Sequence, residues 1–131
     1  MTGYRSALSL QHVTTSLLLL TIALDYVYPI VYSWHVLTTH QTEVFSKWLN
    51  KLLDRKGRAL ILSRIARMEL GHFGDAKSVG AGVSELRISF GPGYRVYFTK
   101  RGEEVVILLC GGDKGSQSSD IKKAQEMAAK L

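Results

Sequence analysis

The chain has 131 residues, of which 46% are apolar and 21% are charged, and its formal net charge is +6. This length allows one domain with a single hydrophobic core and excludes two domains of ordinary size. The apolar content excludes a generally disordered chain. The first 33 residues hold one cation, Arg5, and one anion, Asp25, so the whole excess of +6 lies in residues 34–131. Such an excess favours an anionic partner, either nucleic acid, a membrane surface or an acidic protein, with solubility alone as the alternative.

The first predicted element is an apolar leader over residues 1–30, in which residues 13–24 are almost all apolar or Thr/Ser. This run is shorter than the roughly 20 residues of a membrane-spanning helix, and extending it to Trp34 would bury Asp25 at a cost of about 3 kcal/mol. A signal peptide fits the length, but the only early cation is Arg5 and no small-x-small cleavage site follows. In a third alternative, translation starts at Val31. We therefore predict a weakly ordered or untranslated leader and a domain over residues 31–131.

Residues 34–39 predict a short strand, and an amphipathic helix follows it. Thr42 is suited to the N-cap of this helix, and Glu43 lies in the first turn, where the helix dipole favours an anion. The apolar residues of the helix recur at the spacing of one helical face: Phe45, Trp48, Leu49, Leu52 and Leu53.

A turn over residues 54–57 and a second helix over residues 58–70 are predicted next, and Gly71 is suited to the C-terminal cap. The apolar residues of this helix are Ile61, Leu62, Ile65, Met68 and Leu70. Its arginines are expected to form a solvated face, with RNA contact as the alternative: Arg58, Arg64 and Arg67.

The hydrophobic period then changes to two, which predicts strands. Residues 84–89 and 94–99 form a hairpin around Gly91-Pro92-Gly93, and residues 105–110 form a continuous apolar run typical of a strand covered on both faces. Residues 111–114 are expected to end that strand. Ser119 is suited to cap a last helix whose apolar side is Ile121, Ala124, Ala128 and Leu131.

Hydrophobic patterning also predicts the register of the hairpin. With an odd number of loop residues, Leu86 faces Val96 and Ile88 faces Tyr94, whereas an even number mixes apolar and polar side chains on one face. The odd register places Arg87 opposite Arg95, where like charges are unfavourable unless an anion lies between them. Two alternatives explain the pair: Glu85, opposite Tyr97, neutralises it, or the arginines bind one phosphate. On this polar face, loss of Arg95 should cost little stability.

Signatures of other enzyme chemistries are missing from the sequence. It contains no HExxH, CxxC pair, Walker loop or nucleophile elbow, and His35, His40 and His72 do not have the spacing of a metal site. Cys110, the only cysteine, cannot form an internal disulfide, which fits a reducing cytosol, and its apolar surroundings predict a buried, inert thiol. No metal or cofactor is predicted.

Three motifs in order resemble one known family. They are residues 79–87 (VGAGVSELR), 91–98 (GPGYRVYF) and 108–114 (LLCGGDK), followed by Ser116-Gln117 and Asp120-Ile121. Together they resemble the "addiction module killer protein" branch of the RelE/HigB-type toxin superfamily, over about three quarters of the chain. The resemblance implies an α+β fold with two N-terminal helices on a curved, mainly antiparallel sheet of four to five strands and a short C-terminal helix.

The resemblance also implies a function, the toxin of a type II toxin–antitoxin system that cuts mRNA on the ribosome without a metal ion. The 2′-hydroxyl of the scissile nucleotide attacks the adjacent phosphate, and cations from the sheet stabilise the developing charge. By this resemblance, Arg95 matches the arginine that stabilises the transition state in the family. Arg87 lies on the strand that supplies basic residues in relatives, and Lys114 lies near the end of the strand that supplies another cation. The residues expected to bind RNA are Lys77, Glu85, Tyr97, Gln117 and Asp120.

The C-terminal motif departs from the family. Studied relatives have a tyrosine or histidine where residues 116–120 read SQSSD, and Gln117 and Asp120 replace them by position only. The general base therefore stays unassigned. The expected partners are a cognate helix-turn-helix antitoxin and the mRNA-programmed ribosome, in the cytoplasm. The alternatives are a RelE-like module that binds RNA or a partner without efficient cleavage, and a membrane-associated protein anchored by residues 17–24.

Overall fold

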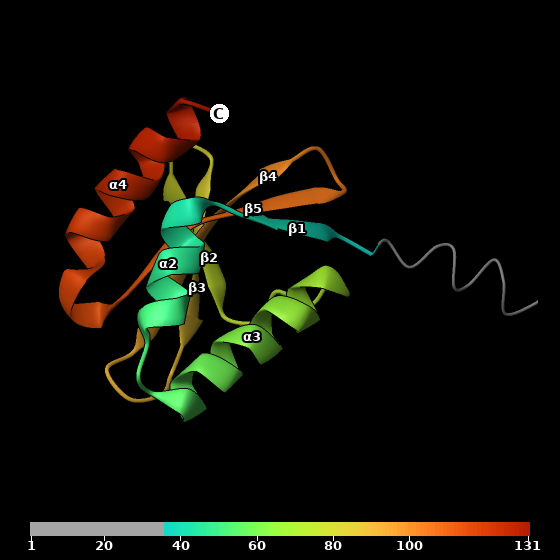
Figure 1. Ribbon diagram of the computed structural model, residues 1–131. Helices are drawn as coiled ribbons and strands as arrows, with labels where there is room; N and C mark the ends of the chain where they lie inside the picture. Colours follow the sequence, from blue (N-terminus) through green and yellow to red (C-terminus); the bar gives the residue numbers. More distant parts are fainter. Residues whose placement is uncertain (1–35) are drawn as a thin grey trace, which may run out of the picture. The chain divides into compact units, whose positions relative to one another are not determined.

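A computed structural model describes residues 36–131 of this protein (Figure 1). The predicted leader over residues 1–30, and the beginning of the domain and of the first strand, lie outside these residues. In chain order the elements are β1 (Thr38–Gln41), α2 (Glu43–Lys51), α3 (Arg55–Glu69), β2 (Ala76–Gly80), β3 (Val83–Ile88), β4 (Tyr94–Arg101), β5 (Val105–Asp113), the short 3₁₀ helix η1 (Lys114–Ser116) and α4 (Gln117–Ala129). None of these helices has the length and apolar character needed to cross a bilayer.

The strands form one five-stranded sheet in the order β1-β5-β4-β3-β2. β1 runs parallel to β5, and the other neighbours are antiparallel. This arrangement confirms the predicted α+β class and the mainly antiparallel sheet. It also leaves β2 at one edge of the sheet and places β5 in the interior, as its continuous apolar run predicts.

Helices cover both faces of the sheet (Figure 1). Buried residues of α2 and α3, including Phe45, Ile61 and Met68, pack on one face of the strands. Ala124 of α4 packs on the opposite face against a second cluster that contains Tyr97, Leu109 and Cys110. The register shift between β4 and β5 makes Leu109 an extra residue in β5, which is why Leu109 and its neighbour Cys110 both belong to the α4 side.

Helix caps explain where the predicted boundaries were right and where they were wrong. The Thr42 hydroxyl accepts the N–H of Phe45 at 3.1 Å, which confirms the first N-cap. The predicted turn over residues 54–57 is wrong, because Asp54 accepts the N–H of Gly57 at 2.9 Å and starts α3 there. Since α2 has ended at Lys51, the side chain of Leu53 is 95% exposed and does not belong to the apolar stripe.

Two further expectations on α3 are corrected by the structure. Leu62 and Leu70 are exposed, although both were expected on the apolar face. Arg64 is not a solvated arginine, because it donates to the carbonyls of Arg87 at 2.8 Å and Phe73 at 3.1 Å. Arg64 therefore joins α3 to the sheet.

The last helix begins earlier than predicted. Asp113 accepts the N–H groups of Gly115 and Ser116, so the chain turns into η1 directly after β5, which itself extends through residues 111–113. Ser119 lies inside α4 and not at its N-cap. The N-terminal turn of α4 is thereby held close to the end of β5, where the candidate site lies.

Candidate functional site

The polar residues of interest lie in two rows that cross the sheet on its α4 side. The observed pairs Leu86–Val96, Arg87–Arg95, Ile88–Tyr94 and Glu85–Tyr97 confirm the odd register of the hairpin. On the outer side of β3, Lys77 faces Glu85, and Asp75 accepts the backbone N–H of Arg87. From the edge inward, one row is therefore Asp75, Arg87, Arg95 and Gly112, and the next is Lys77, Glu85, Tyr97 and Cys110.

Arg87 is paired with a carboxylate at the edge of the sheet. Its Nη2 and Nε donate to Oδ1 of Asp75 at 2.7 and 3.1 Å. The side chains are 35% and 48% exposed, so solvent screens this pair and water reaches the guanidinium. The expectation that Glu85 neutralises both arginines is therefore wrong for Arg87, whose partner is Asp75.

Arg95 has a different environment, because it lies deeper in the site. Its side chain is 12% exposed, and its Nε lies 3.6 Å from Oε1 of the fully buried Glu85. This pair is a charge contact without a hydrogen bond. Glu85 thus holds the inner side of the Arg95 guanidinium, and the two arginines have different carboxylate partners in this structure.

Glu85 is itself fixed by two further donors. The Tyr97 hydroxyl donates to its Oε2 at 3.2 Å, and Nε2 of Gln117, from the first turn of α4, donates to the same oxygen at 2.8 Å. Burial, reinforced by the charge of Glu85, raises the pKa of Tyr97 above its usual value of 10. The side chains of Glu85 and Tyr97 are fully buried in this structure, so their observed role is to hold the carboxylate beside Arg95, and their contact with RNA stays a prediction.

The Cβ of Lys114 and the guanidinium of Arg95 both lie beside Gly93. Gly93, in the turn before β4, has a φ of +79°, and a Cβ on it would lie 3.4 Å from Cβ of Lys114 and 3.7 Å from Nη1 of Arg95. The lysine and the guanidinium therefore flank the same glycine. The exposed Lys114 and the outer side of Arg95 can approach one anionic group from adjacent positions.

Comparisons with known proteins agree with this architecture. The family described as "Phage derived protein Gp49-like (DUF891)" matches residues 47–130. An uncharacterized protein of Haemophilus influenzae is 50% identical over 90 residues, which cover 69% of this chain and 91% of that protein. A mutant of the E. coli toxin RelE, solved in the free state, has the same fold with a TM-score of 0.54 and 19% identity, over 72% of this chain and 96% of RelE.

The chain belongs to the Gp49-like family. With its RelE-like fold, this family places the chain in the RelE-type toxin superfamily, as the three sequence motifs predicted. The matched residues 47–130 include every residue of the two polar rows, so the site of this Gp49-like protein lies within the part that defines the family.

The remaining candidate residues of the Gp49-like protein have separate positions. Lys77 is exposed on the site face of β2, next to the arginine–aspartate pair. Asp120 accepts a hydrogen bond from Ser116 at 2.5 Å and packs over Gly112, so it fixes the start of α4.

Cys110 is buried, and burial raises the pKa of its thiol to about 11, as expected for an inert cysteine. Within residues 36–131, no three His, Cys, Asp or Glu side chains gather to form a metal site.

Asp75 and the strand β2 that follows it were not predicted from the sequence. That strand contains Lys77, Ser78 and a terminal Gly80 and does not alternate cleanly, so hydrophobic periodicity gave no signal there. The position of Gly74 and Gly80 on either side of a short polar segment was the available signal for an edge strand.

Proposed function

We propose that this Gp49-like protein is the toxin of a type II toxin–antitoxin system and cuts mRNA on the ribosome in the cytoplasm. The single observation that supports this proposal most directly is the juxtaposition of Arg95 and Lys114 around Gly93. A cognate helix-turn-helix antitoxin would neutralise the toxin.

In the proposed reaction the scissile nucleotide's 2′-hydroxyl attacks the adjacent phosphorus and gives its proton to solvent. The bond from phosphorus to the 5′-oxygen breaks, and this oxygen takes a proton from solvent, which leaves a 2′,3′-cyclic phosphate and a 5′-hydroxyl end. Negative charge accumulates on the phosphoryl oxygens before that bond is broken. The Arg95 guanidinium, held on its inner side by Glu85, and the Lys114 ammonium would stabilise this charge without a metal ion. Preorganisation is favourable here because the guanidinium is already oriented before the substrate binds.

Arg87 and Lys77 would have a different role in this proposal. Both belong to the exposed β2–β3 side of the site face and would bind the RNA backbone next to the cleaved bond. An incoming phosphate would compete with Asp75 for the guanidinium of Arg87. Because solvent screens that ion pair, breaking it costs little free energy.

Cleavage of mRNA on programmed ribosomes tests the proposal. We expect the wild-type chain to cut, and Arg95→Lys to cut roughly a hundredfold more slowly, since lysine keeps the charge without the planar, two-pronged donor geometry. Arg101→Lys, at the exposed end of β4, is the matched control and should cut as wild type does. Circular dichroism checks folding. A folded wild-type chain that arrests no growth and cuts no ribosome-bound mRNA would overturn the proposal.

A second candidate function is a RelE-like module that binds RNA or a partner without efficient cleavage. The observation that favours it lies at the start of α4, where the side chains of two residues are already hydrogen-bonded within the protein. Gln117 donates to Glu85, and Asp120 accepts from Ser116. Neither is therefore placed as a free proton-transfer group. Ribosome binding without cleavage in the same assay would support this candidate.

A further inference from the structure

The turn between β3 and β4 joins the two faces of the sheet. On the α4 side, Gly93 lies beside the guanidinium of Arg95 and Cβ of Lys114. The side chain of Tyr94, the next residue in the chain, is buried on the opposite face, in the core beneath α2 and α3. The backbone of Tyr94 pairs with Asp113, directly before Lys114, and its carbonyl accepts Nη1 of Arg95 at 3.4 Å. The position of Tyr94 therefore affects both cations.

The side chain of Tyr94 is fixed by the start of α3. Its hydroxyl donates to Oδ2 of Asp54 at 2.7 Å, and Oδ1 of the same carboxylate caps α3 by accepting the N–H of Gly57 at 2.9 Å. A Cβ on Gly57 would lie 2.5 Å from the Tyr94 ring, so the glycine permits this close approach. The ring also makes an edge contact with Trp48 of α2, with centroids 6.4 Å apart. Two helices therefore hold Tyr94 in place.

A second contact from α3 reaches the other end of the turn. The ammonium of Lys56 lies 5.2 Å from the centre of the Phe90 ring, within the range of a cation–π interaction. The N–H of Gly93 donates to the carbonyl of Phe90 at 3.0 Å and closes the turn. The start of α3 thus contacts the first residue of the turn through Lys56 and the residue after the turn through Asp54.

We infer that Asp54 and Tyr94 are positioning residues for the proposed cleavage pair, Arg95 and Lys114, although their side chains meet on the opposite face of the sheet. The hydrogen bond between them fixes the start of β4, and the start of β4 sets the separation of the two cations. A misplacement of about 1 Å can lower a reaction rate roughly a hundredfold, even when its source lies far from the reacting atoms. The inference rests on the proposed function, since it names a further determinant of the same site.

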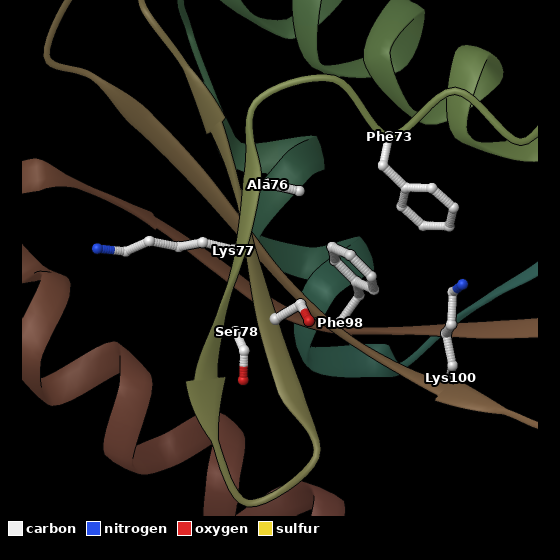
Figure 2. Close-up of a pocket in the computed structure, with 7 residues that line it drawn as sticks. Phe73, Ala76, Lys77, Ser78, Phe98 and Lys100 are labelled. Carbon is white, nitrogen blue, oxygen red and sulfur yellow. The ribbon is translucent and has the colours of Figure 1, made fainter.

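Two similar contacts lie away from the turn and provide controls. The Thr39 hydroxyl donates to Oε1 of Glu69 at 2.6 Å, so a second hydroxyl–carboxylate hydrogen bond joins a strand to α3, at the C-terminal end of this helix. The ammonium of Lys100 lies 4.4 Å from the centre of the Phe73 ring, beside an open pocket of about 310 Å³ (Figure 2). Lys100 lies near the end of β4 that is remote from Tyr94. Both contacts can therefore be removed without changing the turn.

The test removes the hydrogen bond between Asp54 and Tyr94 from either side. Tyr94→Phe keeps the ring and removes only the hydroxyl. Asp54→Ser keeps an N-cap for α3, because a serine hydroxyl can accept the N–H of Gly57, but its side chain is too short to reach Tyr94. On programmed ribosomes each variant should lower kcat roughly tenfold with KM unchanged, because neither side chain touches RNA. The double variant should be no slower than the slower single variant, since all three lack the same bond.

Two control variants separate positioning from a general loss of stability. Thr39→Val also removes one hydroxyl that donates to a carboxylate of α3, and Lys100→Ala removes a lysine from an aromatic ring. Both should cut mRNA with the kcat of the wild type. Circular dichroism checks folding, and urea unfolding measures the loss of stability in each variant. A control whose kcat falls as far as that of Tyr94→Phe would overturn the inference, and so would wild-type kcat in folded Tyr94→Phe and Asp54→Ser.

A second measurement does not depend on cleavage. Nε of Arg95 is buried, so we expect its hydrogen to exchange slowly with solvent in the full-length, ¹⁵N-labelled chain. Tyr94→Phe should speed this exchange roughly tenfold, whereas Thr39→Val should leave it unchanged. A wild-type chain that cuts no mRNA but shows this difference refutes the proposed cleavage and supports the positioning of the guanidinium. A wild-type chain that cuts mRNA, with exchange and kcat unchanged in Tyr94→Phe, refutes the positioning alone.

Discussion

Nε of Arg95 lies 3.6 Å from Oε1 of the fully buried Glu85, and neither atom hydrogen-bonds to any described residue. Charge attraction therefore holds the pair, and the carboxylate depends on the guanidinium for compensation. This geometry disagrees with the expectation that loss of Arg95 costs little stability. A buried ion left without its partner typically destabilises a protein by about 3–5 kcal/mol.

The first prediction follows from this pair. We expect Arg95→Ala to lower the free energy of unfolding by about 3 kcal/mol or more, and the double variant Glu85→Gln/Arg95→Ala to recover part of the loss because no buried charge remains uncompensated. Urea unfolding followed by circular dichroism measures each variant. A double variant whose loss equals the sum of the single losses would contradict the interaction.

The second prediction concerns Arg87, whose exposed pair with Asp75 contributes little to stability. Arg87→Ala should change the free energy of unfolding by about 1 kcal/mol or less. If Arg87 binds the RNA backbone as proposed, the variant should raise KM for ribosome-bound mRNA while kcat changes less. A fall in kcat at unchanged KM would place Arg87 at the reacting phosphate instead.

The third prediction concerns stability in acid. Asp54 accepts the N–H of Gly57 at 2.9 Å and the hydroxyl of Tyr94 at 2.7 Å, and these bonds lower the pKa of Asp54 below its usual value of 3.8. A carboxyl whose pKa is lowered on folding stabilises the protein above its unfolded pKa, and this contribution is lost as pH falls through the folded pKa. We therefore expect the stability of the wild type to decrease below about pH 4, and that of Asp54→Asn to decrease less steeply.

Urea unfolding across a pH series gives these slopes. Tyr94→Phe removes one of the two hydrogen bonds to Asp54 and should give an intermediate slope. The same hydrogen bond raises the pKa of Tyr94 to about 12. Parallel curves for the wild type and Asp54→Asn would exclude this carboxyl as a source of acid sensitivity.

The fourth prediction concerns the close packing of Trp48 on β5. A Cβ on Gly111 would overlap the indole ring, so Gly111→Ala should destabilise the fold by about 1–3 kcal/mol. The smaller side chain of Trp48→Leu should make the same alanine less costly. Thermal unfolding of the two single variants and the double variant measures this coupling, and additive losses would argue against the overlap.

The fifth prediction concerns the leader. The hydrophobic pattern of the sequence from Trp34 onward supplies a core, and among the described residues 36–131 two buried clusters form from it. We therefore expect residues 31–131 to unfold cooperatively without residues 1–30. Denaturant unfolding and near-ultraviolet circular dichroism of the shortened chain provide the measurement. A shortened chain that is insoluble or lacks a cooperative transition would show that the leader belongs to the fold.

The sequence by itself determined the hairpin and its register. Leu86 and Ile88 on one strand, and Val96 and Tyr94 on the next, can share a buried face in only one pairing, so a local pattern fixes which residues oppose each other. The same reasoning placed Arg87 opposite Arg95. The ordered motifs around these strands were also sufficient to predict the superfamily.

Only the tertiary structure decided what surrounds those arginines. Gln117 approaches Glu85 from 32 positions away in the chain, and α4 buries Glu85 and Tyr97 on a face where strand alternation alone indicates solvent exposure. Asp75 meets Arg87 through an edge strand that has no apolar period. Alternation reports which side of a strand a residue occupies, whereas burial and charge partners depend on which distant segment packs there.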